Sequence, residues 1–377
     1  MERTLLVAVQ LDRRYGPSWP VEDELRELEE LARSAGCRSV GQSIVRRHTP
    51  IAGTFIGSGK LEELARQVDE QQAQVVIVNQ ELSPAQQRNI EDALRVKTID
   101  RTQLILDIFA QRARSQEGKV QVELAQLRYL MPRLIGKGVL LSRLGGGIGT
   151  RGPGEQKLEV DRRRIRRRIT KLNDELKKLA RRREATRQRR KEAQVPIVAL
   201  VGYTNAGKTT LLNRLTGADA PVEDRPFTTL DPLAKRLWLP APPGDRGQAG
   251  RDGTWVVLTD TVGFLHQLPH HLIEAFKATL EETQDAAVLL HVLDASHPLA
   301  LEQAEAVQEV LTLLQLRDKP LITVLNKRDQ VRDPHGLSAL EPHLPNPVAI
   351  SALRGEGLED LLRKCQALLK SAWHFVS

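Results

Sequence analysis

The sequence predicts a multidomain α/β protein in which an antiparallel helical hairpin joins two domains with parallel sheets. The chain has 377 residues, enough for two or three hydrophobic cores. Strand-like and helix-like stretches alternate near both ends, which is typical of parallel α/β domains. Between these ends, apolar residues recur with the seven-residue period of packed helices. We expect the domains to span residues 1–113, 114–193 and 194–377.

Residues 1–113 contain the first predicted sheet. TLLVAVQL is expected to form its first strand, followed by the amphipathic helix VEDELRELEELARSAG. CRSVGQSIV, QVVIV and KTIDR have the composition of three further strands, and helical patterns separate and follow them. Ser83 and Pro84 are typical of an N-cap and a first helical turn. This alternation predicts a small parallel α/β domain.

The stretch GTFIGSGKL, residues 53–61, has the glycines of a phosphate-binding loop without their spacing. Thr54 stands where the first Gly of GxxxxGK would be, and Leu61 stands where a Mg²⁺-binding Ser or Thr would be. We therefore expect a turn or a docking loop here, with a nucleotide site as the weaker alternative.

Residues 114–193 are predicted to form two antiparallel helices. Apolar residues of the first helix follow a 4-3-4-3 spacing, and Pro132 is expected to end or kink it. Six apolar residues of the second helix fall on a and d positions of one heptad register. The first stripe is Val120, Leu124, Leu127, Met131 and Leu134, and the second is Leu158, Ile165, Ile169, Leu172, Leu176 and Leu179.

Positive charge is concentrated on the second of these helices. The net charge is +8, yet residues 161–191 alone hold sixteen Lys and Arg against four Asp and Glu. A basic arm on otherwise acidic domains predicts a nucleic-acid partner, although a solvated helix face is the alternative. The Gly-rich loop over residues 137–155 is expected to contact RNA rather than to act as a plain hinge. The predicted RNA-binding residues are Arg143, Arg151, Arg162, Arg163, Arg166 and Arg167.

The third domain begins with the strand, loop and helix VPIVALVGYTNAGKTTLLNRL. Gly202, Gly207, Lys208 and Thr209 match the phosphate-loop pattern GxxxxGK[ST] in the required context. Backbone N–H groups of such a loop surround phosphates. Lys208 is expected to reach the β- and γ-phosphates, and Thr209 is expected to bind Mg²⁺.

Further motifs follow in the order that a GTPase requires. Thr229 is the predicted switch threonine that completes the Mg²⁺ shell, and Thr228 is the less favoured candidate. Asp260 ends an apolar strand, and the N–H of Gly263 can bind the γ-phosphate. In the stretch NKRD, Asp329 would accept hydrogen bonds from groups that guanine has and adenine lacks.

The third domain is therefore predicted to be a Ras-like P-loop GTPase domain with a mostly parallel sheet. Its predicted catalytic residues are Lys208, Thr229 and Gly263. The predicted nucleotide contacts are Gly202, Tyr203, Thr204, Asn205, Ala206, Gly207, Lys208, Thr209, Phe227, Thr228, Thr229, Leu230, Asp231, Asp260, Thr261, Val262, Gly263, Asn326, Lys327, Arg328, Asp329, Ser351, Ala352 and Leu353. The backbone of the last three is expected to meet the guanine O6.

Phe264, in the stretch DTVGF, occupies the position where Ras-like proteins carry the Gln that orients water. An apolar ring cannot do this, so we expect slow hydrolysis by the free protein. Two sources of help are considered: a partner that orders the switch segments, and a K⁺ ion near the phosphates. Asn205 is the candidate K⁺ ligand. The alternative is that Phe264 only packs under the switch.

Composition excludes several other classes of protein. No apolar run approaches a membrane span, and the first residues do not match a signal peptide. The two cysteines, Cys37 and Cys365, have no metal-ligand spacing and suit a reducing cytoplasm. Aromatic residues make up 3% of the chain, so we do not expect a surface built on stacked bases. We expect a cytoplasmic protein that is monomeric when free. His270 and His271 are expected to open a helix, and Asp294 to cap a strand end.

The chain resembles the HflX family of P-loop GTPases. The resemblance rests on GGGIGTRGPGEQKLEVDRRRIRRRI upstream of GYTNAGKT, on FTTLD and DTVGF, and on the three-part layout. It implies a bacterial GTPase that binds the large ribosomal subunit through rRNA, acts in splitting, recycling or rescue of stalled ribosomes under stress, and is partly ribosome-associated. Two alternatives remain at this point: a GTP-gated RNA-binding or ribosome-assembly module with slow turnover, and a nucleotide-driven RNA-unwinding enzyme.

Overall fold

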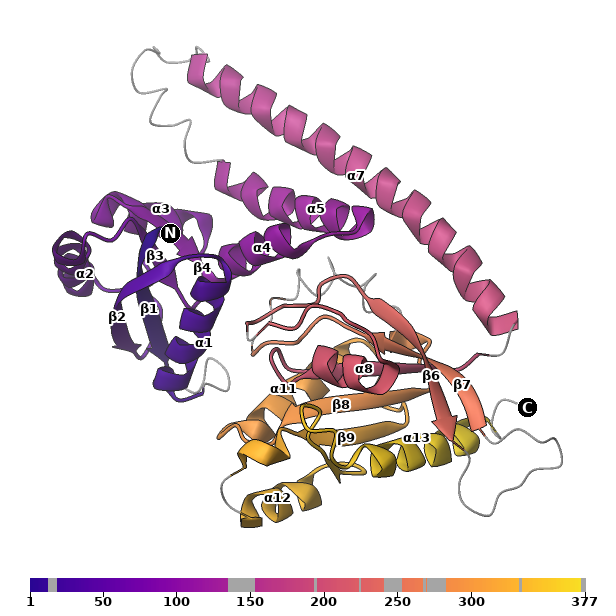
Figure 1. The fold of residues 1–377 in the computed structure, drawn as a ribbon. Coiled ribbons are helices and arrows are strands. Elements are labelled where there is room, and N and C mark those ends of the chain that lie inside the picture. Colours follow the sequence, from indigo (N-terminus) through magenta and orange to yellow (C-terminus); the bar gives the residue numbers. More distant parts are fainter. Residues whose placement is uncertain are drawn as a thin grey trace. The chain divides into compact units, whose positions relative to one another are not determined.

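The fold was analysed in a computed structural model of the 377-residue chain (Figure 1). The residues that it describes are 1–12, 19–134, 153–192, 195–223, 225–240, 253–266, 269, 283–331 and 334–373. They divide into two compact units, Met1–Lys177 and Lys178–Ser377. Within this described part, no helix is both long enough and apolar enough to cross a membrane.

The first unit contains a four-stranded sheet in the order β2-β1-β3-β4, with every neighbouring pair parallel. The helices α2 and α3 cover the sheet face that carries Leu5, Val7 and Val9, where they complete a buried core. This arrangement confirms the predicted small parallel α/β domain (Figure 1). The elements are β1 (Arg3–Leu11), α1 (Val21–Ser34), β2 (Arg38–Arg47), α2 (Ser58–Gln71), β3 (Val75–Val78), α3 (Pro84–Leu94), β4 (Lys97–Asp100) and α4 (Arg101–Arg112).

Local sequence signals explain two helix starts in this unit. Ser83 and Gln86 exchange side-chain and backbone hydrogen bonds in a capping box, with Pro84 as the first helical residue of α3. The phosphate-loop-like stretch 53–61 forms a turn that leads into α2, as expected. Lys60 pairs with Glu63 of the same helix, and Leu61 is buried in the core. Neither side chain is therefore arranged to hold a nucleotide.

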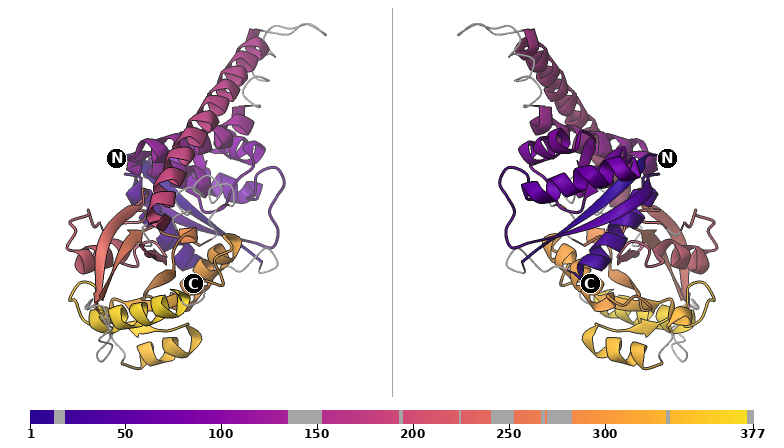
Figure 2. Two further views of the ribbon diagram at one scale, coloured as in Figure 1. Left: turned by 90° about the vertical axis from the view of Figure 1, so that its right-hand side faces the viewer. Right: turned by 90° about the vertical axis from the view of Figure 1, so that its left-hand side faces the viewer.

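The helical hairpin is formed by α5 (Gln116–Arg133) and the first part of α7 (Pro153–Glu192) (Figure 2). Its core follows the two predicted stripes: Val120 and Leu124 pack with Leu172, and Leu127, Ile169 and Leu176 surround them. Arg168 donates two hydrogen bonds of 2.6 Å to Glu123 across the pair. Pro132 lies in the last turn of α5, so Leu134 is outside the helix. The loop over residues 135–152, including Arg143 and Arg151, lies outside the described residues.

The second unit contains a six-stranded sheet in the order β10-β9-β8-β5-β7-β6. Only β6 and β7 pair antiparallel, so the predicted mostly parallel sheet is confirmed. The helices α8 and α13 pack on one face, and α11 packs on the other. The elements are β5 (Ile197–Gly202), α8 (Lys208–Thr216), β6 (Leu233–Pro240), β7 (Gly253–Asp260), β8 (Val288–Asp294), α11 (Ala300–Leu313), β9 (Leu321–Asn326), α12 (Pro334–Leu340), β10 (Val348–Ala349) and α13 (Leu358–Trp373).

Candidate nucleotide site

The loop between β5 and α8 has a shape that its glycines make possible. Gly202 has φ +152°, and a Cβ atom there would lie 2.2 Å from the carbonyl oxygen of Val292. Gly207 has φ +92°, and its Cβ would lie 2.3 Å from Nδ2 of Asn326. A side chain at either position would collide with its neighbour or strain the backbone. The loop therefore keeps its backbone N–H groups close to the start of α8, as phosphate-binding loops do.

Lys208, the first residue of α8, is a buried cation at the base of this loop. Its Nζ donates hydrogen bonds to the carbonyl oxygens of Gly202, at 3.1 Å, and of Tyr203, at 2.7 Å. Burial lowers the pKa of Lys208 to about 8, and the nearby charge of Asp260 opposes this effect. Since both hydrogen-bond acceptors are neutral, an anion that entered the pocket would strongly favour the charged ammonium.

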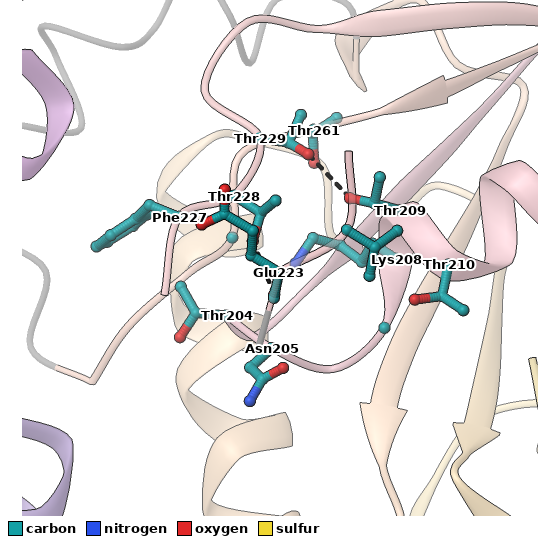
Figure 3. A pocket seen from close by; sticks show the side chains of 13 residues that line it. Thr204, Asn205, Lys208, Thr209, Thr210, Glu223, Phe227, Thr228, Thr229 and Thr261 are labelled. Carbon is teal, nitrogen blue, oxygen red and sulfur yellow. Dashed lines mark hydrogen bonds between the residues drawn. The ribbon is translucent and has the colours of Figure 1, made fainter. Parts of the chain in front are cut away.

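The hydroxyl groups of Thr209 and Thr229 lie close together in the pocket (Figure 3), and both contact the carboxylate of Asp260. The hydroxyl of Thr209 lies 2.7 Å from Oδ2 of Asp260, and the hydroxyl of Thr229 lies 3.0 Å from the same atom. The two hydroxyl oxygens are 2.9 Å apart. Thr228 points elsewhere, because its hydroxyl donates to backbone oxygens of Glu223 and Arg225.

Asp260 is fully buried, and burial raises the pKa of its carboxyl group. The charge of Lys208 and the hydroxyls of Thr209 and Thr229 act in the opposite direction. The backbone N–H of Thr261 also lowers the pKa of Asp260. Within the described part of the chain, its second oxygen, Oδ1, accepts no hydrogen bond of normal geometry. A buried carboxylate oxygen without a donor, next to two hydroxyls, fits the hard-oxygen preference of Mg²⁺. The described residues hold no cluster of three or more His, Cys, Asp or Glu, so an ion here would depend on hydroxyls, phosphate and water.

These side chains line a pocket with about 410 Å³ of empty space, partly open to solvent. Gly263 forms part of its wall, and a Cβ there would lie 2.8 Å from Cγ2 of Thr204 and 3.1 Å from Nζ of Lys208. Any side chain at position 263 would therefore occupy the space beside the ammonium. The lining residues are Thr204, Asn205, Gly207, Lys208, Thr209, Thr210, Val222, Glu223, Phe227, Thr228, Thr229, Thr261 and Gly263.

Phe264 is packed behind this pocket and is only 1% exposed. Its backbone N–H donates to the oxygen of Gly202 at 3.0 Å, and its oxygen accepts from the N–H of Thr204 at 2.8 Å. These two bonds join the end of the DTVGF stretch to the phosphate loop. The buried ring of Phe264 anchors the DTVGF stretch. Phe264 is not among the described residues that line the pocket.

The NKRD stretch begins at Asn326, the last residue of β9, and β8 separates β9 from β5, which leads into the phosphate loop. Asn326 is buried and bridges two segments: its Nδ2 donates to Ala206 O at 2.8 Å, and its Oδ1 accepts from Ala352 N at 3.0 Å. The side chain of Asp329 is 7% exposed, with Nε of Arg354 4.0 Å away. Asn326 therefore holds the phosphate loop and the loop after β10 in register, while the carboxylate of Asp329 is largely buried near Arg354.

Asp294 has a role that the sequence reading did not find. It was expected to cap the end of β8, and its Oδ1 does accept a hydrogen bond from the N–H of Ser296 at 3.0 Å. Its other oxygen forms an ion pair of 2.6 Å with Nζ of Lys327. The register of the strands could have revealed this ion pair. Asp294 and Asn326 are paired residues of neighbouring parallel strands, and Lys327 is the residue after Asn326.

Not every predicted contact lines the pocket. Tyr203, Ala206, Leu230 and Val262 are buried, and Ser351 uses its hydroxyl to accept a hydrogen bond from Arg354 N at 3.1 Å. Leu353, in contrast, is 71% exposed. Three lining residues were missed by sequence reasoning because they belong to no short motif: Thr210, Val222 and Glu223.

Among the predicted RNA contacts that the structure describes, Arg163, Arg166 and Arg167 are exposed on α7, and Arg162 is half-buried. His270 and His271, with the helix expected to follow them, lie outside the described residues.

A parallel sheet, a glycine-shaped phosphate loop, a buried Lys and the Thr–Thr–Asp cluster together define a P-loop GTPase. Family profiles divide the chain in the same sense: "GTP-binding GTPase N-terminal" matches residues 22–110, "GTP-binding GTPase Middle Region" matches 112–190, and "50S ribosome-binding GTPase" matches 197–327. The chain belongs to the HflX GTPase family, as the resemblance implied, and it hydrolyses GTP.

Two HflX relatives and one solved structure of a GTP-binding protein are similar to this chain over most of its length. GTPase HflX of Caldanaerobacter subterraneus subsp. tengcongensis is 51% identical over 378 aligned positions, covering 100% of this chain and 82% of the relative. GTPase HflX of Escherichia coli K12 is 46% identical, covering 90% of this chain and 78% of the relative. The crystal structure of SsGBP in complex with GDP is 26% identical with a TM-score of 0.52, covering 98% of this chain and 99% of that one.

Proposed function

We propose that this GTPase binds the large ribosomal subunit through rRNA and acts in splitting, recycling or rescue of ribosomes in the cytoplasm. The observation that carries the proposal is the row of exposed arginines on α7. Among the described residues, no ion pair neutralises Arg163, Arg166 or Arg167. Uncompensated guanidinium groups on one helix are suited to phosphate contacts. The description "50S ribosome-binding GTPase" of the matching profile supports the large subunit as the partner.

For the nucleotide site, we assign the phosphates to the loop between β5 and α8 and the guanine base to the NKRD stretch. Lys208 would neutralise the β- and γ-phosphates, and Thr209 and Thr229 would hold Mg²⁺ with Asp260 behind them. When bound, Mg²⁺ supplies charge that opposes the negative charge of the transferred phosphoryl group. The N–H of Gly263 would bind a γ-phosphate. Asp329 would accept from guanine, while Asp294 holds Lys327 beside it.

We assign acceleration of hydrolysis mainly to the ribosome. Phe264 is fixed in the base of the phosphate loop and has no polar atom to hold water, so the free protein should turn over slowly. A K⁺ ion at Asn205 is a compatible second contribution. Figure 3 shows the Asn205 side chain directed away from Thr209 and Thr229, so a role in K⁺ binding requires this side chain to reorient.

Turnover measurements separate the two contributions. GTP hydrolysis is measured in K⁺ and in Na⁺, with and without large subunits, for the wild type and for Asn205→Ala. Stimulation by subunits that persists in Na⁺ and in Asn205→Ala supports the ribosome alone. Stimulation that requires both K⁺ and Asn205 supports the ion. Fast turnover of the free protein in Na⁺ contradicts both assignments.

The ribosome proposal is tested by co-sedimentation with isolated large and small subunits. The arm variant replaces Arg162, Arg163, Arg166 and Arg167 with Gln and should lose most of its large-subunit binding while it keeps nucleotide affinity. A control variant loses the same charge from exposed arginines elsewhere: Arg33, Arg38, Arg66 and Arg317 to Gln. Binding should also fall steeply with salt, because phosphate contacts release counterions. Equal binding by both variants, or binding that is insensitive to salt, contradicts the proposal.

The two alternatives have different signatures. A GTP-gated assembly module would bind subunits but show no stimulation of turnover by them. An RNA-unwinding enzyme would accept ATP, and competition of ATP against GTP for the site measures this directly.

A further inference from the structure

Two of the four tryptophans lie side by side on the surface of the second unit. Trp238 of β6 and Trp255 of β7 are directly paired across the antiparallel strands. Their ring centroids are 5.1 Å apart, in an edge-to-face arrangement with an interplanar angle of 62°. Trp238 is 39% exposed and Trp255 is 56% exposed. Large rings are usually buried against a core, so a paired and exposed set suggests a binding surface.

The strand alternation shows that this pair is not needed for the core. Leu237 and Leu239 of β6 are buried on the sheet face covered by α8 and α13. Trp238 points to the opposite face. Among the described residues, neither tryptophan belongs to the buried core cluster of this unit.

The two rings are also held in place before any partner binds. A Cβ atom at Gly253 would lie 2.6 Å from Cζ2 of Trp238, so this ring lies directly over the glycine backbone. The edge of one tryptophan contacts the other on the neighbouring strand. A surface whose side chains are already ordered loses little conformational entropy on binding.

Positive charge borders the ring pair. Arg236 lies two residues before Trp238 and therefore on the same face of β6, where it is exposed. Neither β6 nor β7 carries an exposed acidic side chain; the single acid in the two strands, Asp260, is fully buried. Flat aromatic surfaces beside cations match a nucleobase and its phosphate, and RNA-binding proteins stack unpaired bases on such rings.

We infer that Trp238 and Trp255, with Arg236, form a docking surface for unpaired RNA bases. This surface is named the Trp patch. The inference deepens the proposed rRNA binding and rests on it, because it adds a stacking contact from the GTPase domain to the phosphate contacts of the arm. It also revises the expectation drawn from the low aromatic content: few aromatic residues are present, but two of them are placed together.

The test measures binding of a fluorescein-labelled rA12 oligonucleotide to the full chain by fluorescence anisotropy. The variant W238L/W255L should weaken binding about 10-fold, within the range typical of lost base stacking. W238F/W255F keeps flat rings and should stay close to the wild type. R236Q should weaken binding modestly and make it less dependent on salt. Because the arm can also bind RNA, the series is repeated with the four arm arginines replaced by Gln, where the effect of Leu should persist.

Three results would overturn the Trp patch. In the first, W238L/W255L binds rA12 as the wild type does. In the second, the Phe variant loses as much as the Leu variant and also loses mant-GDP affinity, so the rings only support the fold. In the third, the Leu variant keeps rA12 affinity but loses co-sedimentation with large subunits, so the partner is a protein surface. Failure of the wild type to co-sediment would instead contradict the proposed ribosome function, and rA12 binding would still decide on the patch.

Discussion

The two parallel sheets of this protein end in different ways at their carboxyl edges. Each edge carries a fully buried aspartate, Asp100 after β4 and Asp260 after β7. Asp100 accepts four hydrogen bonds of 2.7–3.1 Å, from the N–H groups of Leu82 and Gln103, the hydroxyl of Tyr129 and the guanidinium of Arg133. Asp260 accepts hydrogen bonds from the hydroxyls of Thr209 and Thr229, and the backbone N–H of Thr261 also favours its charged form. Among the described residues, its Oδ1 accepts no hydrogen bond of normal geometry.

This difference shows why the same sheet architecture gives a structural joint in one unit and a candidate ligand site in the other. Ligands of open parallel sheets bind outside the carboxyl ends of the strands. In the first unit, α5 fills that position: Arg133 lies over the ring of Tyr129, 3.4 Å from its centroid, and both side chains bind Asp100. In the second unit, Asp260 is buried behind Thr209 and Thr229, and these two threonines line a pocket.

The largest difference between the two edges is expected in catalysis. Lys208→Ala should reduce GTP turnover at least about 100-fold, because it removes the buried charge that would face the phosphates. Asp260→Asn should also impair turnover strongly. The matched control is Asp100→Asn, which makes the same chemical change at the other edge and should leave mant-GDP affinity unchanged. Steady-state GTPase assays on all three variants provide the comparison, and wild-type turnover by Lys208→Ala would refute the assignment of the site.

For stability, the first unit should be the more sensitive of the two, because Asp100 is the aspartate with the structural role. Asp100→Asn leaves the buried Arg133 without its anionic partner, which should destabilise the first unit by about 3 kcal/mol. Hydrogen exchange of the β3 and β4 amides in the full chain measures this effect. Tyr129→Phe removes one neutral donor and should cost about 1 kcal/mol. Unchanged protection in Asp100→Asn would mean that this edge is not the structural joint described above.

The stability of the first unit should also depend on pH, through the carboxyl group of Glu24. Burial raises the pKa of Glu24 from 4.5 to about 7, although Arg101 and the hydrogen bond from Asn79 oppose this. The folded state therefore binds a proton more tightly than the unfolded state does. The resulting stability is fully present below pH 4.5 and is lost as pH rises toward 7, by about 3 kcal/mol at most. Hydrogen exchange of β1 at several pH values reports the slope. Glu24→Gln should flatten it, and an equally steep slope in that variant would assign it to another group.

The last predicted effect concerns the choice of base. Asp329→Asn replaces an acceptor with a donor, so GTP affinity should fall about 10- to 100-fold, and xanthosine triphosphate should bind better than before. Competition against mant-GDP measures both affinities. Binding of xanthosine triphosphate by the variant is the internal control, because a misfolded variant would bind neither nucleotide. Wild-type affinity for GTP in this variant would remove guanine recognition from Asp329.

Local sequence patterns predicted the fold class well, because they report local structure. The 4-3-4-3 stripe of α5 and the Ser83–Pro84 pair each describe a few neighbouring residues, and both were found as expected. Contacts between distant segments could not be read in this way. Tyr129 meets Asp100 only because α5 folds back on β4, and Lys327 meets Asp294 only because β8 and β9 are neighbours in the sheet.

The site shows the same division. The phosphate loop was recognisable because its spacing is fixed by one turn, whereas the pairing of Trp238 with Trp255 depends on the register of two strands. The two backbone hydrogen bonds that join Phe264 to the phosphate loop likewise connect segments that are distant in the sequence.

The proposal that nucleotide state controls ribosome binding is tested most directly by co-sedimentation with large subunits in GDP and in a non-hydrolysable GTP analogue. If a γ-phosphate holds both Thr229 and Gly263, as we propose, the analogue should raise the bound fraction, and Thr229→Ala should abolish the difference. Equal binding of the wild type in both nucleotides would contradict the claim that the GTPase domain is the switch.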